Sequence, residues 1–274
     1  NAATCYKLKN KGVIAPGYIA DFSIVTDLEK LNISQVYKNG VLVAKNRELV
    51  DRIEPSAHLP SKNLITSIKI PDVTVLDLDI DMLGSHKANI IEVIPGSVVS
   101  NHLIEPVKVE NGKFKINVKK DLLKIAVVER HKNLGNIAVG IIKGLKLKKG
   151  AIASTVAHDS HNLIIVGTNE SDMVAAIHAI QGMQGGIVIV NKGRILSSLK
   201  LEGAGLITSR PASEVMEDLK ALRNTISQMA PECSFDPFLA LSFMSLVVIP
   251  HLKICDQGVF NVNTFSFIDV PYVE

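Results

Sequence analysis

The sequence predicts an α+β or mixed α/β fold, in which a small β-sandwich part is followed by a mixed-sheet domain covered by helices. Short runs of β-branched and other apolar residues, often alternating with polar ones, recur between turn residues. Two Asn-Gly pairs stand between such runs, and both residues accept the positive φ that a tight hairpin turn requires. Later segments repeat apolar residues every three or four positions, which is the period of a helix with one buried face.

A polar segment divides the chain into two predicted domains. The 274 residues are enough for about one or two domains. Residues 52–62 are mostly polar and contain Pro55 and Pro60, so we expect a linker there. We therefore assign residues 1–55 to a first domain and residues 56–274 to a second.

The first domain contains strand patterns and no helix pattern. Residues 21–25 form one predicted strand after a Pro-Gly turn. Residues 35–38 and 41–44 are predicted to pair across Asn39 and Gly40. Since a sheet without a helix of its own cannot cover both of its faces, we expect these strands to complete a small β-sandwich with strands from elsewhere.

The second domain opens with predicted strands and one short predicted helix. An Asn-Gly turn at Asn111 and Gly112 closes a second hairpin. Residues 137–144, which are glycine-rich, are predicted to form the short helix, and residues 163–167 predict a buried strand. The strands predicted before these cover residues 65–70, 73–80, 90–94, 108–109, 113–118 and 125–129.

The remaining segments predict further helices and a third hairpin. Asn169 is placed to cap a helix over residues 172–183, and Met173, Ile177 and Ile180 share one face of that helix. The other predicted elements are a hairpin at 187–190 and 194–199, an amphipathic helix at 213–229, and an apolar helix that Asp236 and Pro237 begin and that continues through 238–249.

The composition argues against several classes of protein. A net charge of +3 and an aromatic content of 4% provide neither a strong positive field nor many rings for base stacking, so we expect no nucleic-acid partner. The apolar run 238–249 is shorter than the roughly 20 residues that a membrane helix needs, so we expect no membrane partner. Cys5, Cys233 and Cys255 do not form a disulfide framework, which predicts a cytoplasmic location.

Polar side chains gather at two predicted strand ends. One set follows the strand at 125–129, and the other comes just before the strand at 163–167. If these strands are neighbours, the two sets meet at one rim of the sheet, where ligand-binding groups commonly collect. The candidate site residues are Glu129, Arg130, His131, His158, Asp159, His161 and Asn162.

This rim has three possible roles. As a metal site it offers only the weak candidates His131, His158 and His161, since residues at i and i+3 of a strand point to opposite faces and a zinc site needs three or four ligands. As a hydrogen-bonding and proton-handling rim it would face a pocket or a domain interface, because His titrates near neutral pH. As a structural brace it would only hold a turn. We favour the second role.

Several motifs resemble one family, the bacterial adenine deaminases of the amidohydrolase superfamily, in their C-terminal region. The motifs are E-R-H-K-N-L-G-N-I-A-V-G-I-I-K-G from Glu129, A-H-D-S-H-N-L-I-I-V-G from Ala157, G-G-I-V-I-V from Gly185, A-G-L-I-T-S from Ala204 and D-P-F-L-A-L-S-F from Asp236. The front of the chain, N-A-A-T-C-Y-K-L from Asn1 and G-V-I-A-P-G-Y-I-A-D-F-S-I-V from Gly12, resembles the place where an amidohydrolase barrel ends and its β-domain resumes.

The resemblance implies an activity and a place in a longer protein. Residues 1–55 would be the remainder of an amidohydrolase β-sandwich domain, residues 56–274 the adenine deaminase C-terminal α/β domain, and the chain would begin in mid-protein. The intact enzyme would convert adenine and water to hypoxanthine and ammonia with a divalent metal of the Mn or Fe type, held by the missing barrel. Its partner would be a small-molecule purine, and we expect a homo-oligomer.

The catalytic residues of that family have no counterpart in this sequence. The family's metal centre begins with an H-x-H pair, and no H-x-H occurs here, so no catalytic residue is identifiable and we expect the fragment to be inactive. Two alternatives remain open. The chain could be a non-catalytic scaffold or oligomerisation module that buries residues 238–249 against a partner, or it could belong to another amidohydrolase that acts on a cyclic amidine or amide.

Overall fold

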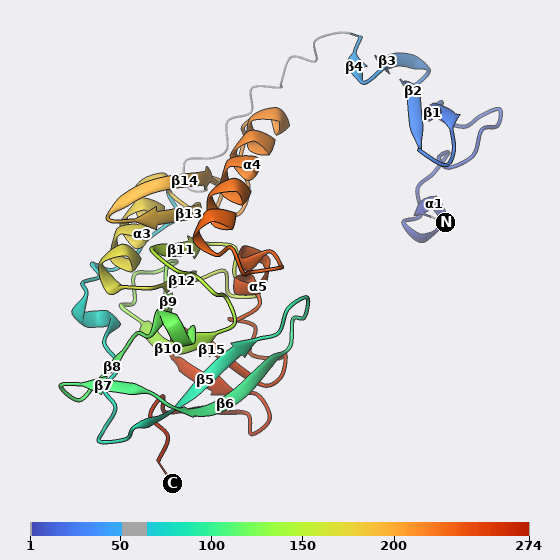
Figure 1. Cartoon of the computed structure of the whole chain (residues 1–274). Coiled ribbons are helices and arrows are strands. Elements are labelled where there is room, and N and C mark those ends of the chain that lie inside the picture. The colour runs from blue at the N-terminus through green and yellow to red at the C-terminus, as the bar shows by residue number, and fades with distance from the viewer. Residues whose placement is uncertain (1, 51–64, 274) are drawn as a thin grey trace. The chain divides into compact units, whose positions relative to one another are not determined.

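The computed structural model describes residues 2–50 and 65–273, and the chain forms two compact units (Figure 1). Unit 1 comprises Asn1–His58 and unit 2 comprises Leu59–Glu274. The predicted linker at residues 52–62 lies outside the described residues. Each unit is considered by itself.

Unit 1 is built on one antiparallel sheet in the order β1-β2-β3-β4. Its elements are α1 (Ala2–Cys5), β1 (Phe22–Asp27), β2 (Asn32–Lys38), β3 (Val41–Lys45) and β4 (Glu48–Leu49). Lys38 pairs with Val41 across Asn39 and Gly40, whose φ values are 49° and 80°. The predicted strands and the predicted hairpin of this unit are therefore confirmed.

Contacts between neighbouring strands stabilise this small sheet. Phe22 of β1 lies opposite Tyr37 of β2, and their rings stack with centroids 4.7 Å apart. The carboxylate of Asp21 accepts a hydrogen bond from the backbone N–H of Asn39 at 2.8 Å and pairs with Lys11 at 2.7 Å. The hydrogen bond from Asn39 joins the residue before β1 to the turn between β2 and β3.

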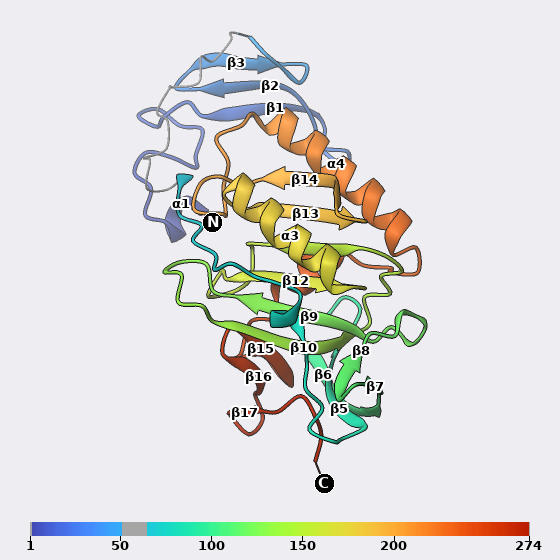
Figure 2. The same ribbon diagram turned by 90° about the vertical axis from the view of Figure 1, so that its left-hand side faces the viewer.

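Unit 2 contains an eight-stranded mixed sheet in the order β14-β13-β11-β12-β9-β10-β5-β6 (Figure 2). Its strands are β5 (Lys87–Val93), β6 (Ser100–Pro106), β9 (Leu123–Val128), β10 (Ile137–Lys143), β11 (Ala151–Ser154), β12 (Leu163–Gly167), β13 (Gly186–Asn191) and β14 (Arg194–Lys200). Neighbouring strands are antiparallel except for β5 and β10, which are parallel. The predicted mixed α/β class is confirmed.

Smaller elements complete unit 2. They are the hairpin β7 (Lys108–Glu110) and β8 (Lys113–Lys115), the sheet of β15 (Leu252–Cys255), β16 (Gly258–Asn261) and β17 (Ser266–Ile268), the 3-10 turns η1 (Leu76–Leu78) and η2 (Val118–Lys120), and the helices α3 (Glu170–Met183), α4 (Ala212–Met229) and α5 (Pro237–Ser242). Glu110 pairs with Lys113 across the predicted Asn-Gly turn, so the second hairpin is confirmed. The hairpin of β13 and β14 is confirmed as well.

The short helix predicted at residues 137–144 is wrong, because this segment is strand β10. The strand lies between β9 and β5 inside the sheet, and Ile141 and Ile142 are fully buried. A central strand buried on both faces has a continuous apolar sequence, and over so short a run the sequence does not distinguish it from a buried helix. Because residue 140 is glycine, β16 can pack closely on β10. A Cβ atom at this position would lie 3.2 Å from the side chain of Val259.

The strands predicted at residues 65–70 and 73–80 are also wrong. Ile68 and Ile70 are buried two residues apart, as are Leu78 and Ile80, but residues 66–80 contain no strand and only the 3-10 turn η1. Its backbone makes isolated bonds, such as Lys69 N–H to the carbonyl of Arg130 at 2.8 Å. The alternation of apolar residues therefore reflected burial against the core and not pairing within a sheet.

The other predicted helices are confirmed, with one difference in length. The side chain of Asn169 caps α3 by accepting from the N–H of Asp172 at 2.8 Å, and Met173, Ile177 and Ile180 are fully buried. The carboxylate of Asp236 caps α5 in the predicted manner.

Helix α5 ends at Ser242, so the predicted continuation to residue 249 is wrong. Val247, Val248 and Ile249 are β-branched, and Pro250 follows them, which disfavours a helix through that segment. Among the described residues no helix is long and apolar enough to cross a membrane.

The eight-stranded sheet is buried on both faces. On β9, Ala126 and Val128 belong to the core that contains the apolar face of α3, whereas Ile125 and Val127 belong to the core beneath α4, α5 and β15. Because successive side chains of a strand point to opposite faces, one apolar strand serves both cores. Figure 2 shows α3 over one face of the sheet.

Lys253 is an exception in this core. Its side chain on β15 is fully buried, and its ammonium group donates to the backbone carbonyl of Val98 at 2.8 Å. Burial lowers the pKa of Lys253 from 10.5 to about 8. Within the described part of the chain it forms no ion pair, so its charge is costly to bury.

We expect this cost to appear in the pH dependence of stability. The folded protein releases the proton of Lys253 near pH 8, and the unfolded chain releases it near pH 10.5, so between these values the unfolded state binds more protons and stability rises with pH. The Lys253→Met variant should lack this rise. It should also be more stable at pH 7 by about 1–2 kcal/mol, since the pKa difference outweighs the lost hydrogen bond. Urea denaturation of both proteins from pH 7 to pH 10 measures this; parallel profiles would contradict it.

Candidate functional site

The candidate site lies where β9 ends and β12 begins. These strands are antiparallel neighbours, with Val128 directly opposite Leu163. Residues 129–131 and 158–162 are therefore held at the same edge of the sheet. The structure thus brings together the two polar sets that the sequence placed at two strand ends.

Arg130 joins the two sets from inside the protein. Only 1% of this residue is exposed. Its Nε donates to the carbonyl oxygen of His161, and its Nη2 donates to the carbonyl oxygen of Ala204 at 3.1 Å. Burial lowers the pKa of Arg130 to about 10, against the opposing effect of the nearby Glu129 charge, so the guanidinium remains protonated at neutral pH.

Glu129 builds the loop that follows β9. Its Oε1 accepts from the backbone N–H groups of His131 at 2.6 Å and Lys132 at 2.8 Å, and its Oε2 accepts from that of Leu134 at 2.9 Å. Burial raises the pKa of the Glu129 carboxyl, but these three bonds more than offset it and the pKa is lowered. Glu129 is therefore a loop brace, and it is 5% exposed.

His131 extends from this loop to the other polar set. Its side chain is exposed, and its Nε2 donates to the carbonyl of Ser160 at 2.8 Å. This bond fixes the protonated ring nitrogen as Nε2 and fixes the direction of the ring.

His158 and His161 meet across a turn of the backbone. The turn is closed by a bond from the N–H of His161 to the carbonyl of Ala157 at 2.6 Å, and the two imidazole rings lie 5.6 Å apart, edge to face. The ring of His158 also packs on Phe243, with centroids 4.8 Å apart. Both histidines are half-buried.

The surroundings of His161 favour the neutral form of its imidazole. Burial lowers the pKa of His161, the neighbouring His158 ring and the Arg130 charge lower it further, and exposed Asp159 opposes them. The Nδ1 atom is buried and has no hydrogen-bond partner in the structure. A neutral imidazole with one uncommitted nitrogen can accept or donate a proton.

Asn162 connects the site to the C-terminal sheet. It is 4% exposed, and its Nδ2 donates to Asp256 at 3.1 Å. The other oxygen of the Asp256 carboxylate accepts from Asn136 at 3.0 Å. The Oδ1 atom of Asn162 is buried without a partner. No sequence pattern marks Asp256, which lies in the turn between β15 and β16.

The seven predicted residues thus separate into two layers. Glu129, Arg130 and Asn162 are buried and hold the backbone of the rim. The outer layer consists of His131, His158, Asp159 and His161, which are exposed or half-buried. In the described part of the chain no group of three or more His, Cys, Asp or Glu side chains is arranged to hold a metal ion. The chemistry available to the outer layer is therefore hydrogen bonding and proton exchange.

A loop that sequence reasoning did not assign to the site also contacts it. Besides the bond from Arg130 to Ala204, the hydroxyl of Thr155 donates to the carbonyl of Gly205 at 2.6 Å. The only signal in the sequence was the A-G-L-I-T-S motif from Ala204. That motif contributed to the family resemblance, but it does not indicate which residues the loop contacts.

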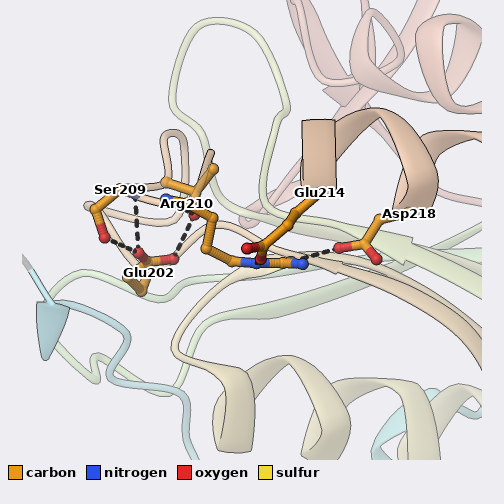
Figure 3. Close-up of polar contacts among 6 residues, drawn as sticks. Glu202, Ser209, Arg210, Glu214 and Asp218 are labelled. Atoms are coloured by element: carbon orange, nitrogen blue, oxygen red, sulfur yellow. Dashed lines mark hydrogen bonds and ion pairs between the residues drawn. The ribbon is translucent and has the colours of Figure 1, made fainter. Parts of the chain in front are cut away.

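Hydrogen bonds to Glu202 and ion pairs of Arg210 hold the rest of this loop (Figure 3). The Glu202 carboxylate accepts from the N–H of Ser209 at 3.0 Å and from the hydroxyls of Ser209 and Thr208 at 2.8 and 2.9 Å. Arg210 pairs with Glu214 and Asp218 of α4. Burial raises the pKa of Glu202, but the hydrogen bonds dominate and lower it to about 2.

Comparison with known proteins places this architecture in a family. The sequence profile of the adenine deaminase C-terminal domain matches residues 97–266, and that of the amidohydrolase family matches residues 1–43. The chain belongs to the adenine deaminase C-terminal domain family. All seven candidate residues and the loop from Glu202 to Arg210 fall within that match.

Individual adenine deaminases are similar along the whole chain. The protein of that name from Geobacillus kaustophilus is 46% identical over 273 residues, which is 100% of this chain and 47% of the relative. Those from Halalkalibacterium halodurans and Lysinibacillus sphaericus are 45% and 43% identical over 98% of this chain. The chain spans about half the length of these relatives and corresponds to their C-terminal part.

The bonds of Glu202 predict acid sensitivity in this adenine deaminase C-terminal domain. Since the folded pKa lies below the ordinary 4.5, the stabilisation is complete above pH 4.5 and is lost as the pH falls from there towards 2. Glu202→Gln should therefore cost on the order of 1–2 kcal/mol at pH 7, with allowance for its partial exposure, and nothing near pH 2.

Chemical denaturation monitored by circular dichroism at pH 7, 4 and 3 tests this expectation. Glu217→Gln, a change on the exposed side of α4, is the control and should leave stability unchanged at every pH. A Glu202→Gln cost that stays constant from pH 7 to pH 3 would show that its charge is not what stabilises the loop.

Proposed function

We propose that this chain is the C-terminal half of an enzyme that deaminates adenine. In that reaction the oxygen of water bonds to C6 of the purine, the bond between C6 and the amino nitrogen breaks, and the amino group leaves as ammonia, which gives hypoxanthine. The observation that carries the proposal is the similarity over 98–100% of this chain to proteins named adenine deaminase. The role we propose for such an enzyme is in purine salvage.

A metal ion would activate the attacking water in such an enzyme. We propose a divalent ion of the Mn or Fe type, which would make water acidic enough to supply hydroxide at neutral pH. The described residues of this chain do not fit such an ion, since no three potential ligands converge and His131 already bonds to a backbone carbonyl. The metal ligands therefore belong to the other half of the proposed enzyme, and no step of the metal chemistry is assigned to this chain.

We assign the two parts of the chain different roles. Residues 1–55 would complete the β-sandwich that accompanies an amidohydrolase barrel, which the match of residues 1–43 to the amidohydrolase family supports. Residues 56–274 would form the C-terminal α/β domain. We further propose a cytoplasmic homo-oligomer, supported by three unpaired cysteines and by the exposed apolar side chains of Leu239 and Val248.

The outer layer of the candidate site would border the substrate pocket in the intact enzyme. His131, His158, Asp159 and His161 would bind or orient a polar ligand there. Two features support this role: His161 Nδ1 is uncommitted, and the buried layer beneath fixes the backbone of the rim through charged groups. Rigid support beneath polar side chains is what a binding site requires.

The first test concerns the isolated chain. We expect it to release no ammonia from adenine above a matched blank, with or without added Mn²⁺ or Fe²⁺, because bulk water with a pKa of about 15.7 is a poor nucleophile. A coupled ammonia assay on the purified 274-residue protein measures this. Metal-dependent release by the isolated chain would overturn the division of labour proposed above.

The second test concerns the rim in the full-length enzyme. His158→Ala and His161→Ala should each lower kcat/KM about tenfold or more, equivalent to about 1.4 kcal/mol. The melting temperature should change by no more than a few degrees, because both side chains are only half-buried.

His178→Ala is the matched control, because His178 lies exposed on α3 and outside the rim. It should change neither activity nor melting temperature. Full activity in the rim variants, combined with a large loss of thermal stability, would mean that these histidines only brace the turn.

A further inference from the structure

Arg130 is too deeply buried to touch a substrate. With 1% of its surface exposed, it can influence the rim only through the groups that it contacts. Its acceptors are two backbone carbonyls that lie 31 and 74 residues further along the chain, in separate loops. Among the described residues no carboxylate forms an ion pair with the guanidinium of Arg130. The carboxylate of the adjacent Glu129 instead accepts hydrogen bonds from three backbone N–H groups.

The second loop is closed and tightly packed. Gly203 and Ile207 exchange backbone hydrogen bonds of 2.8 and 3.1 Å. Gly205 has a φ of +73°, and a Cβ atom there would lie only 3.0 Å from Nη1 of Arg130. The guanidinium therefore lies against the backbone of this loop, where only glycine leaves room for it.

We propose that Arg130 is a positioning residue that holds the 157–162 turn and the 203–207 loop as one unit and thereby fixes the backbone that carries His158 and His161. This inference rests on the proposed function for the effect on catalysis, but not for the coupling of the two loops. A lysine cannot reproduce the coupling, because its single ammonium group does not offer the planar fork of a guanidinium to two acceptors.

The coupling is tested on the chain itself by amide hydrogen exchange. In Arg130→Lys, residues 157–162 and 203–207 should both exchange faster, by roughly tenfold, while α3 remains protected. Gly205→Ala should give the same pattern with the arginine still present, because the added methyl group displaces the guanidinium. This second variant serves if Arg130→Lys fails to fold.

Arg210→Lys is the matched control. Arg210 lies at the end of the same connection and forms ion pairs with α4, but it contacts neither loop carbonyl. It should leave exchange at residues 157–162 unchanged. Faster exchange in only one of the two loops of Arg130→Lys, or in neither, would overturn the coupling.

The contribution to catalysis is tested in the full-length enzyme. Arg130→Lys should lower kcat/KM about tenfold, with partial recovery on addition of guanidinium chloride at millimolar concentration.

The outcomes separate the two levels of the proposal. If the His158 and His161 variants are fully active, the proposed function of the rim fails whatever the exchange data show. If those variants are impaired but Arg130→Lys is as active as the parent enzyme, the rim function stands and the positioning role of Arg130 is wrong.

Discussion

The pairing of β9 with β12 is the constraint on which the candidate site depends. It aligns Val128 with Leu163, so the chain leaves one strand and enters the other at the same edge of the sheet. The two strands are buried on both faces, which fixes their register because a slip by one residue would exchange the two cores. The geometry of the rim is therefore set by apolar packing elsewhere in the sheet.

The polar residues of the rim divide the work between them. The buried charges of Glu129 and Arg130 bond to backbone groups, which lets them hold loops that have no regular structure. The imidazoles of the outer layer therefore do not need all of their nitrogen atoms to hold the structure. Nδ1 of His161, for example, has no hydrogen-bond partner. The buried layer thus stabilises the loops, and the outer layer provides the polar groups that face outward.

The sequence predicted those parts of the fold that local chemistry determines. The hairpin at Asn39 and Gly40, the cap at Asn169 and the cap at Asp236 are each specified by a few adjacent residues, and all three are present. Strand β10 was mistaken for a helix because burial on both faces removes the period that distinguishes the two. The alternation at residues 65–80 was real, but it arose from packing and not from pairing.

The candidate site, too, could be predicted from the sequence only in part. The sequence placed residues 129–131 and 158–162 beside two strands and predicted that they meet if those strands are neighbours, and the pairing of β9 with β12 meets that condition. That Arg130 and Glu129 point inward could not be predicted, because both residue types are usually exposed. The roles of Asp256 and of the Ala204 loop depend on the segments that follow β15 and β14, and no local pattern specifies which distant residues these segments contact.

The parallel pairing of β5 with β10 has a consequence for how the sheet is assembled. Ile90 lies opposite Ile141, so this contact closes a long stretch of chain, whereas β5 and β6 form a hairpin whose partners are close in sequence. Contacts between distant residues form slowly, because the entropy of the intervening loop is lost first. We therefore expect the hairpin of β5 and β6 to form before it docks on β10.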